Sequence, residues 1–289
     1  MNPKICIVGS ANIDQISYVD TIPADGETVF GDSYQMGFGG KGANQAVMAG
    51  LLGADVYMIA CLGTDVYNKM TIDNLNSNNV NTDFIQTVDG SSGVAPIWVD
   101  KTGQNRIIVI PGANNLIDAD IAIDSLSNIG PLDVVVGQFE IPLEVNEKVF
   151  EYARNNGVQT VLNPAPAGDV SEKLLNNTSW FIPNEVEFEE MLGEPFNENA
   201  LLKHSKEAKP EIIVTLGEKG CAEVSDGKVY IHQAKKVTAI DTTGAGDAFV
   251  GSFAYGLASK MSKQDSIKLA LEKATNSVTK KGTQSSYKD

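Results

Sequence analysis

The chain has 289 residues, of which 42% are hydrophobic, and this is enough to bury a sizeable core in one large α/β domain. The formal net charge is −15, and so acidic a surface repels phosphate backbones, which argues against binding to nucleic acid. No apolar run approaches the roughly 20 residues that span a bilayer, so we expect no membrane association.

Short apolar runs typical of strands alternate with helical patterns along the chain, beginning with a strand at Lys4–Val8. The elements predicted after it are, in chain order, helix Ala43–Leu52, strand Asp55–Cys61, helix Asn68–Asn78, strand Asp133–Val136, helix Leu143–Asn155, strand Gln159–Leu162, helix Glu185–Leu192, strand Glu211–Leu216, and helices Ala245–Lys260 and Ser262–Thr279. Such alternation predicts an α/β fold with a central, mostly parallel sheet flanked by helices on both faces.

Two stretches, Asn12–Phe38 and Ser91–Ile110, interrupt this rhythm, because they have β patterns and turns but no helix. The turns are expected at Pro23–Gly26 and Lys101–Gly103. Both stretches could be edges of the main sheet. We prefer a small β-sheet lobe, from about 12–38 and 91–110, inserted in a single domain of residues 1–289, because both stretches lie beside a glycine-rich motif.

The first glycine motif, Gly37–Gly42, fits the spacing G-x-G-x-x-G of dinucleotide-binding loops. Such a loop follows the first strand directly, whereas Lys4–Val8 ends well before this motif, and the Walker pattern is absent. The remaining interpretation is a turn that runs into a helix, where bare amides, Lys41 and Asn44 can approach a polyhydroxylated ligand. A tight turn without a ligand is the alternative.

The second glycine motif, Asp241–Asp247, follows a strand-like run at Val237–Ile240 and opens an apolar helix. Glycines at a helix N-terminus let several free N–H groups converge on one anion. Asp247 on the first turn could merely stabilise the helix, but this leaves the Gly244–Gly246 turn unexplained. An anion-binding turn beside a carboxylate is typical of phosphoryl transfer, in which the amides stabilise developing charge and the carboxylate accepts the proton of the attacking hydroxyl.

Cysteine and arginine are both rare in this chain, and each bears on how the protein works. Cys6, Cys61 and Cys221 stand in apolar contexts without metal-site spacing, so we expect reduced core thiols and a cytoplasmic location. The two arginines are Arg106 and Arg154. Because phosphate sites usually employ arginine forks, phosphate is expected to bind backbone amides, lysine or a metal ion here.

The segments Gly39–Ala46 and Asp241–Phe249 resemble the two signatures of the ribokinase-like carbohydrate kinases, the PfkB family, and the similarity runs from about Ile7 to Ser286. Four further stretches resemble the ribokinases among its members: Asn12–Asp14, Pro111–Asn114, Asn163–Ala167 and Pro183–Glu185. The resemblance implies a β-sheet lid over a sugar site, a homodimer formed through the lid, and transfer of phosphate from ATP to the primary 5-hydroxyl of D-ribose with Mg²⁺ and an activating K⁺.

The resemblance also implies a role for individual residues. Asp247 would be the general base, with an anion hole at Gly244, Ala245 and Gly246. The sugar would contact Asn12, Asp14, Gly39, Gly40, Lys41, Asn44 and Glu140. The nucleotide would contact Asn184, Thr215, Gly217, Gly220 and Gly246, with Leu271 beside the adenine. Glu187 would hold Mg²⁺ through water, and K⁺ would bind near Asp241, Thr243, Ser277, Lys280, Gly282 and Ser286.

Three other functions remain open from the sequence. The protein could be a relative that phosphorylates a nucleoside, deoxyribose or a phosphorylated ketose. It could be a catalytically silent sugar or nucleotide binder, which the presence of Asp247 argues against, or a dinucleotide-dependent oxidoreductase. For the nucleotide loop, we expect Gly220→Val to weaken ATP binding while the fold is kept.

Overall fold

One large sheet runs through the computed structural model, which describes residues 2–288. Its strands are β1 (Lys4–Val8), β4 (Asp55–Gly63), β5 (Val80–Asn81), β6 (Ile85–Val88), β9 (Val134–Gln138), β10 (Gln159–Asn163), β11 (Trp180–Phe181), β12 (Glu211–Thr215), β13 (Cys221–Ser225) and β14 (Lys228–His232). Their order is β14-β13-β12-β11-β10-β9-β1-β4-β5, with β6 paired to β4. The pairs β12–β13 and β13–β14 are antiparallel and the others parallel, so the predicted α/β class is confirmed.

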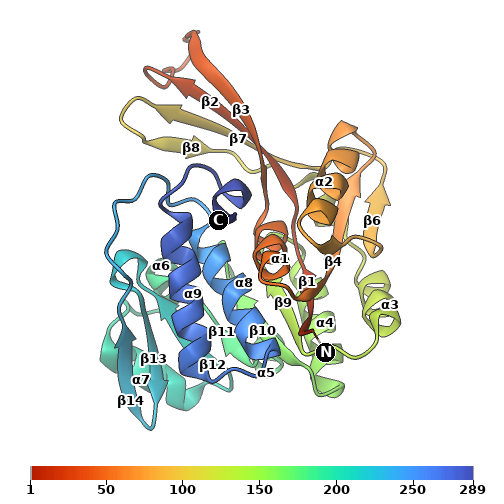
Figure 1. The fold of residues 1–289 in the computed structure, drawn as a ribbon, viewed down its shortest axis with the longest axis vertical. Coiled ribbons are helices and arrows are strands. Elements are labelled where there is room, and N and C mark those ends of the chain that lie inside the picture. The colour runs from red at the N-terminus through yellow and green to blue at the C-terminus, as the bar shows by residue number, and fades with distance from the viewer. Residues whose placement is uncertain (1, 289) are drawn as a thin grey trace.

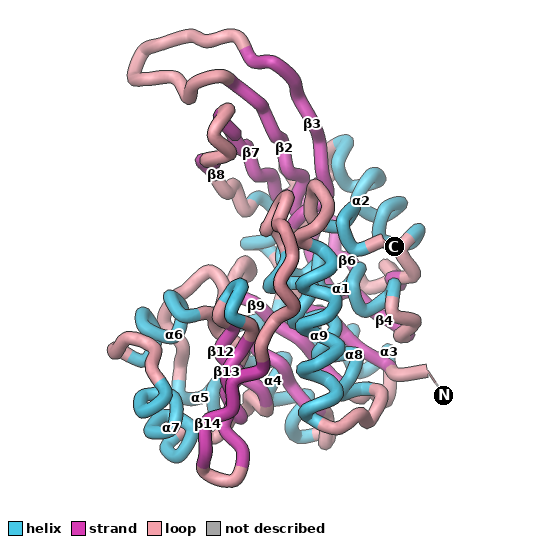
Figure 2. Tube along the Cα trace, turned by 60° about the vertical axis from the view of Figure 1, so that its left-hand side comes forward, coloured by secondary structure: helices cyan, strands magenta, loops and turns pink. Residues whose placement is uncertain are grey.

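Helices cover both faces of the large sheet (Figure 2). One face packs against α1 (Lys41–Leu51), α2 (Val66–Ser77), α8 (Ala245–Ala258) and α9 (Lys263–Ser277). The other packs against α3 (Ala119–Ile129), α4 (Leu143–Asn155), α5 (Glu172–Asn176), α6 (Glu185–Leu192) and α7 (Glu198–Glu207). Three 3₁₀ turns complete the elements: η1 (Gly112–Leu116), η2 (Gly217–Lys219) and η3 (Gln284–Tyr287).

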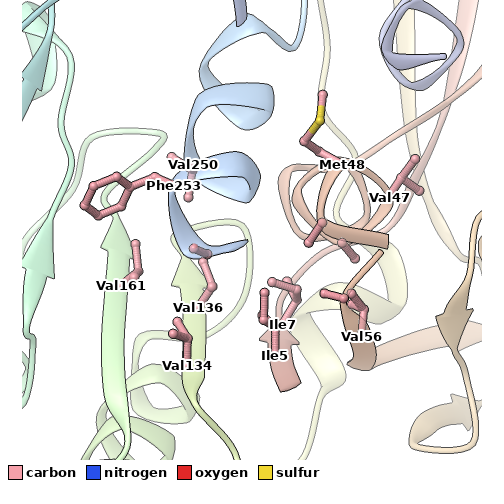
Figure 3. Close-up of a cluster of buried hydrophobic side chains, with 14 of the residues drawn as sticks. Ile5, Ile7, Val47, Met48, Val56, Val134, Val136, Val161, Val250 and Phe253 are labelled. Carbon is pink, nitrogen blue, oxygen red and sulfur yellow. The ribbon is translucent and has the colours of Figure 1, made fainter. Parts of the chain in front are cut away.

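Alternation along the central strands divides the core between the two faces. In β1, Ile5 and Ile7 point towards α1 and α8, whereas Cys6 and Val8 belong to the cluster on the opposite face. Figure 3 shows Ile5 and Ile7 next to Val56 of β4, with valines of β9 and β10 on their other side. The strands are therefore apolar on both sides, as a sheet covered by helices requires.

The three cysteines are buried and free, which confirms their predicted place in the core. Burial raises the pKa of Cys61 to about 11 and that of Cys221 to about 12, so these thiols stay protonated at neutral pH.

A separate small sheet projects beyond the main body, at the top of Figure 1. Its strand order is β3-β2-β7-β8, formed by β2 (Asn12–Val19), β3 (Gly31–Gly39), β7 (Gly93–Asp100) and β8 (Asn105–Ile107). The second sheet expected from the two stretches without helices is thus present, and it is distinct from the edges of the large sheet.

Two details of the sequence-based prediction are wrong. Val237–Ile240 is not a strand, because this segment pairs with no strand of the described chain, and the amide of Ile240 donates instead to the Val278 carbonyl at 2.7 Å. Helices α3, α5 and α7 and the β13–β14 hairpin were not predicted. Over residues 2–288, no helix combines the length and apolarity that a membrane span requires.

Candidate active site

The predicted site residues gather where the parallel strands of the large sheet reach their carboxyl ends. The segment after β1 leads into Asn12, Glu140 follows β9, Asn184 follows β11, and Thr215 ends β12. The N-termini of α1 and α8 lie at the same edge, and this edge is where α/β sheets bind their ligands.

The first glycine motif is explained by close packing at the start of α1. Gly40 has φ +85°, and a Cβ there would lie 2.7 Å from the backbone of Ala11. A Cβ on Gly42 would lie 2.7 Å from the Gly9 carbonyl carbon. Gly39 leaves space for a neighbouring acid, since its Cβ would lie 2.4 Å from the Asp14 carboxylate. These glycines therefore bring α1 against the chain that leaves β1.

Asp247, on the first turn of α8, is held by two side-chain amides from α1. Asn44 Nδ2 donates to Asp247 Oδ2 at 2.9 Å, and Gln45 Nε2 donates to Oδ1 at 3.0 Å. The Asp247 side chain is buried, at 7% exposure. Burial raises its pKa, and this shift is opposed by Lys41 and by the two amides. A buried carboxylate of raised basicity is suited to accept a proton.

The Lys41 side chain interacts with the carboxylates around Asp247. Burial lowers the pKa of Lys41, but the carboxylates of Asp247, Glu140 and Glu187 outweigh this effect, and the pKa is raised overall. Lys41 is therefore a permanent cation beside the base. Burial, then Glu140 and Asp247, raise the pKa of Asp14 to about 7.

Glu140 ties three segments of the site together. Its carboxylate accepts the Lys41 amide at 3.0 Å and the Ser10 hydroxyl at 2.5 Å. Asn12 is fixed nearby by Asn114, whose side chain donates to Asn12 Oδ1 at 2.7 Å. Three of the predicted sugar-contacting side chains, those of Asn12, Asn44 and Glu140, are therefore already held by hydrogen bonds.

The C-terminal segment packs against the turn before α8. Gly244 has φ +75°, and a Cβ there would lie 2.3 Å from Thr283 Cγ2. The Tyr287 hydroxyl donates to the Gly244 carbonyl at 2.7 Å. Gly246 faces open space, and the amides of Gly246 and Asp247 have no acceptor within residues 2–288. Of the three residues predicted for the anion hole, Gly246 has a free amide, whereas the Ala245 amide donates to the Thr242 carbonyl at 3.3 Å. The free amides of Gly246 and Asp247 could bind an anion beside the buried carboxylate.

The residues assigned to the nucleotide lie in two different environments. Asn184 and Thr215 are neighbours across a β-bridge, and Gly217 is open. Leu271, on α9, packs against the core. Gly220 has φ +100°, and its Cβ would lie 1.9 Å from the His232 carbonyl oxygen. The expectation that Gly220→Val keeps the fold is therefore wrong, because the change would disturb the β13–β14 hairpin.

The residue expected to hold Mg²⁺ has one carboxylate oxygen available. Glu187 Oε2 accepts the Asn184 amide at 2.8 Å within a capping box. Its Oε1 has no hydrogen-bond partner among the described residues. Hard cations take oxygen ligands, often through water, so Glu187 fits this role.

The residues expected to bind K⁺ lie on two adjoining loops. The Asp241 carboxylate accepts the amides of Thr243 and Gly282, each at 2.9 Å. These bonds overcome its burial and lower its pKa. Ser277, Lys280 and Ser286 belong to the same C-terminal stretch, but their side chains bond to other partners: Ala274, Lys288 and Thr283 respectively.

A cavity of about 670 Å³ lies between the small sheet and the loops before α8 and around η3. The small sheet contributes Asp14 and Phe38 to its wall, and the loops opposite contribute Asp241, Thr243 and Gln284. Of the predicted sugar residues Asp14 lines this cavity, and of the predicted potassium residues Asp241, Thr243 and Gly282 do, whereas Asp247, Lys41 and Glu140 are not part of its wall.

Several residues of the site were not singled out from the sequence. Gln45 belongs to the first motif, but its contact with Asp247 spans 202 positions of the chain. Gln138, Asn163 and Gln284 also join the hydrogen bonds around the base. No local pattern marks these isolated amides, although Asn163 lies in a stretch that the family resemblance includes.

Free amides at the N-terminus of α8 beside a buried carboxylate, at this edge of an α/β sheet, are typical of kinases of small molecules. The pfkB family carbohydrate kinase model matches residues 2–289. The chain therefore belongs to the pfkB family of carbohydrate kinases and is an ATP-dependent sugar kinase.

Relatives with two different substrate names resemble the chain over nearly its whole length. It is 36% identical to a deoxyribokinase of Salmonella typhimurium over 98% of this chain and 95% of the relative. It is 38% identical to a ribokinase of Haemophilus influenzae over 99% and 95%. The structure of Arabidopsis thaliana ribokinase complexed with ribose and ATP matches with a TM-score of 0.89 and 29% identity, over 99% of this chain and 96% of that one.

Proposed function

We propose that this kinase transfers the γ-phosphoryl group of ATP to the primary 5-hydroxyl of D-ribose, giving ribose 5-phosphate and ADP. The observation that supports this most is the pair of carboxylates in one site, the half-buried Asp14 and the buried Asp247. Asp14, from the small sheet, faces the cavity, and Asp247 lies beside the free amides of α8. The ribose and ATP in the related plant structure agree with this assignment.

In this mechanism, Asp247 accepts the proton of the 5-hydroxyl while the hydroxyl oxygen attacks the γ-phosphorus, and ADP leaves. The amides of Gly246 and Asp247 stabilise the charge that develops on the transferred group. Lys41 and Asn44 orient the sugar, and Asn184, Thr215 and Gly217 contact the nucleotide. Glu187 would hold Mg²⁺ through water. The bound ion would neutralise part of the negative charge on the phosphates.

Deoxyribose is the second candidate acceptor, because a deoxyribokinase is among the similar proteins. We expect ribose to have the higher kcat/KM by about one to two decades. Above its raised pKa of about 7, the ionised Asp14 carboxylate accepts hydrogen bonds from secondary hydroxyls. At alkaline pH, a missing hydroxyl therefore leaves a desolvated acceptor at a cost of roughly 1–3 kcal/mol. Initial rates with both sugars at fixed ATP measure the ratio.

Asp14→Ala is the matched control for this comparison and should reduce the preference towards unity. A deoxyribose kcat/KM equal to or above that of ribose in the wild-type enzyme would assign the enzyme to deoxyribose. Absence of turnover with either sugar would reject both pentoses as acceptors.

We also propose that K⁺ activates the enzyme by ordering the turn before α8. The support is the Asp241 carboxylate, which accepts the amides of both Thr243 and Gly282 and so joins the turn before α8 to the C-terminal loop. The rate in KCl is expected to exceed the rate in tetramethylammonium chloride at equal ionic strength. Asp241→Asn should remove the difference, and equal wild-type rates in the two salts would refute the proposal.

The small sheet is proposed to act as a lid within one domain and as the contact between two copies of the chain. Large apolar side chains are exposed on and beside it, with Phe30 at 98%, Tyr34 at 62% and Trp98 at 36% exposure. Exposed apolar surface of this kind marks interaction sites. Sedimentation velocity distinguishes the homodimer from a monomer.

A further inference from the structure

A series of hydrogen-bonded side-chain amides, half-buried at Asn74 and buried at Gln284 and Asn44, ends on the carboxylate of Asp247. Asn74 Nδ2, on α2, donates to Gln284 Oε1 at 2.7 Å. Gln284 Nε2 donates to Asn44 Oδ1 at 2.9 Å, and Asn44 Nδ2 donates to Asp247 Oδ2 at 2.9 Å. Every donor in the series therefore points towards the carboxylate.

The direction of this series matters because a side-chain amide can be reversed. If Asn44 turned its amide over, its oxygen would face Asp247 and repel the anion. Gln284 prevents this, since its Nε2 requires the oxygen of Asn44 on the opposite side. Asn74 fixes Gln284 in the same manner. Donors aligned in series also polarise one another and strengthen the final bond.

The second oxygen of Asp247 is served by an equivalent series from the sheet. Gln138 Nε2 donates to Gln45 Oε1 at 2.8 Å, so that Gln45 Nε2 faces Asp247. Gln284 is 5% exposed, and Gln45 and Gln138 are fully buried. The two series thus hold the plane of the carboxylate from both sides.

The series through Gln284 also connects the base to the C-terminal segment. Gln284 and Tyr287 are the ends of η3, and Tyr287 bonds to the Gly244 carbonyl beneath the anion-binding turn. The 3₁₀ turn η3 therefore contacts both Asn44, which donates to Asp247, and Gly244, which precedes the free amides of α8.

We propose that Gln284 is a positioning residue for phosphoryl transfer, which acts through Asn44 to fix the orientation and the proton affinity of the Asp247 carboxylate. This inference rests on the proposed function, in which Asp247 is the base. Asn74 is the outer member of the same series, and its influence is weaker because it acts through one more bond.

The charged and titratable groups around Asp247 come from five elements or loops. They are Lys41 from α1, Asp14 from β2, Glu140 after β9, Glu187 from α6 and Tyr287 from η3. Exchange of Gln284 for methionine leaves all these groups in place and introduces no charge. A change in the titration of Asp247 would then report the amide series alone.

Gln284→Met is the first test, because methionine keeps the length of the side chain and removes both polar atoms. We expect kcat to fall about tenfold near neutral pH, as the support of a charged acceptor weakens. Loss of aligned donors destabilises the Asp247 anion and raises its pKa. The acidic limb of the kcat profile should therefore move to higher pH by about one unit, with partial recovery of rate at alkaline pH.

Asn74→Leu should move the acidic limb in the same direction by a smaller amount. Gln264→Met makes the same chemical exchange at an exposed position of α9 and should leave the profile unchanged. Denaturant unfolding of each variant measures stability separately. If Gln284→Met does not fold, the Asn74→Leu profile decides the question.

A measurement without turnover separates this inference from the proposed function. Aspartate is labelled with ¹³C at the carboxyl carbon, and the Asp247 signal is the one missing from Asp247→Asn. Its titration midpoint should be higher in Gln284→Met than in the wild-type protein. An inactive wild-type protein would reject the proposed function and leave this readout intact.

The inference would be overturned if the titration midpoint of Asp247 in Gln284→Met equalled that of the wild-type protein. So would a loss of kcat that is uniform across the pH range with no shift of the acidic limb, because that pattern indicates a structural contribution alone. A raised midpoint with a shifted limb supports a positioning role.

Discussion

Asp247→Asn is expected to lower turnover by about 10²–10⁴-fold, while ATP and the sugar still bind. Asparagine keeps the shape of the side chain but cannot accept the proton of the attacking hydroxyl. The amides of Gly246 and Asp247 belong to the backbone and remain, so a residual rate should persist. Steady-state turnover and calorimetric binding of each substrate measure the two effects separately.

The alternative for Asp247, a charge that only stabilises a helix, has a direct control. Asp265 is the acidic residue in the first turn of α9 and is exposed. Asp265→Asn removes the same favourable interaction with a helix N-terminus, yet it should leave turnover within about twofold, since the charge contributes under 1 kcal/mol to stability. Asp247 is not the base if Asp247→Asn keeps more than about a tenth of wild-type turnover, which lies outside the range for general-base removal.

Gly246→Pro is expected to lower kcat by about 10²–10³-fold, the usual cost of one lost oxyanion donor. Proline has no N–H, and in the first turn of a helix that group makes no intrahelical bond. A Cβ at Gly246 would meet no heavy atom within 4 Å outside its chain neighbours and the backbone of its own helix, so the new side chain begins in open space. Rapid-quench measurement of phosphoryl transfer reports the effect on the chemical step.

Gly246→Ala is the matched control, because it adds a side chain in the same direction but keeps the amide. Its kcat should stay within about tenfold of the wild-type value. Equal losses in the alanine and proline variants would show that the position is limited by space, and the amide would then have no place in the mechanism. Gly244 is unsuitable for this test, since a side chain there collides with Thr283.

The parts of the fold that the sequence predicted are those with a local signal. The apolar runs at Lys4–Val8 and Gln159–Leu162 are strands because each presents apolar side chains to both helical layers. Helix α8 begins where the glycine motif predicted, because Gly244 adopts the left-handed conformation directly before it. Val237–Ile240 has a strand-like composition but lacks a neighbouring strand to pair with. Whether a partner strand lies beside a segment depends on the tertiary structure and cannot be read from the composition of the segment.

The supports of the base had no such signal. Gln284 and Asn44 are 240 positions apart, and a single buried amide has no periodicity to reveal it. Polar residues are usually exposed, so sequence reasoning places them on the surface unless a motif singles them out. Their burial follows from the way the C-terminal segment returns across α1, which only the tertiary structure determines.

The return of η3 to α1 has a consequence for the order in which the enzyme becomes competent. During synthesis, the sheet strands, α1 and the glycine turn all emerge before Gln284 and Tyr287 do. A domain generally folds as a unit, so the reaction centre is completed only when η3, which follows every other helix and strand in the chain, docks against α1. Proteolytic removal of η3 would undo this contact, so that activity is lost while the sheet and its helices remain folded. For labelling or immobilisation, the amino-terminal end, which lies away from the small sheet in Figure 1, is the safer point of attachment.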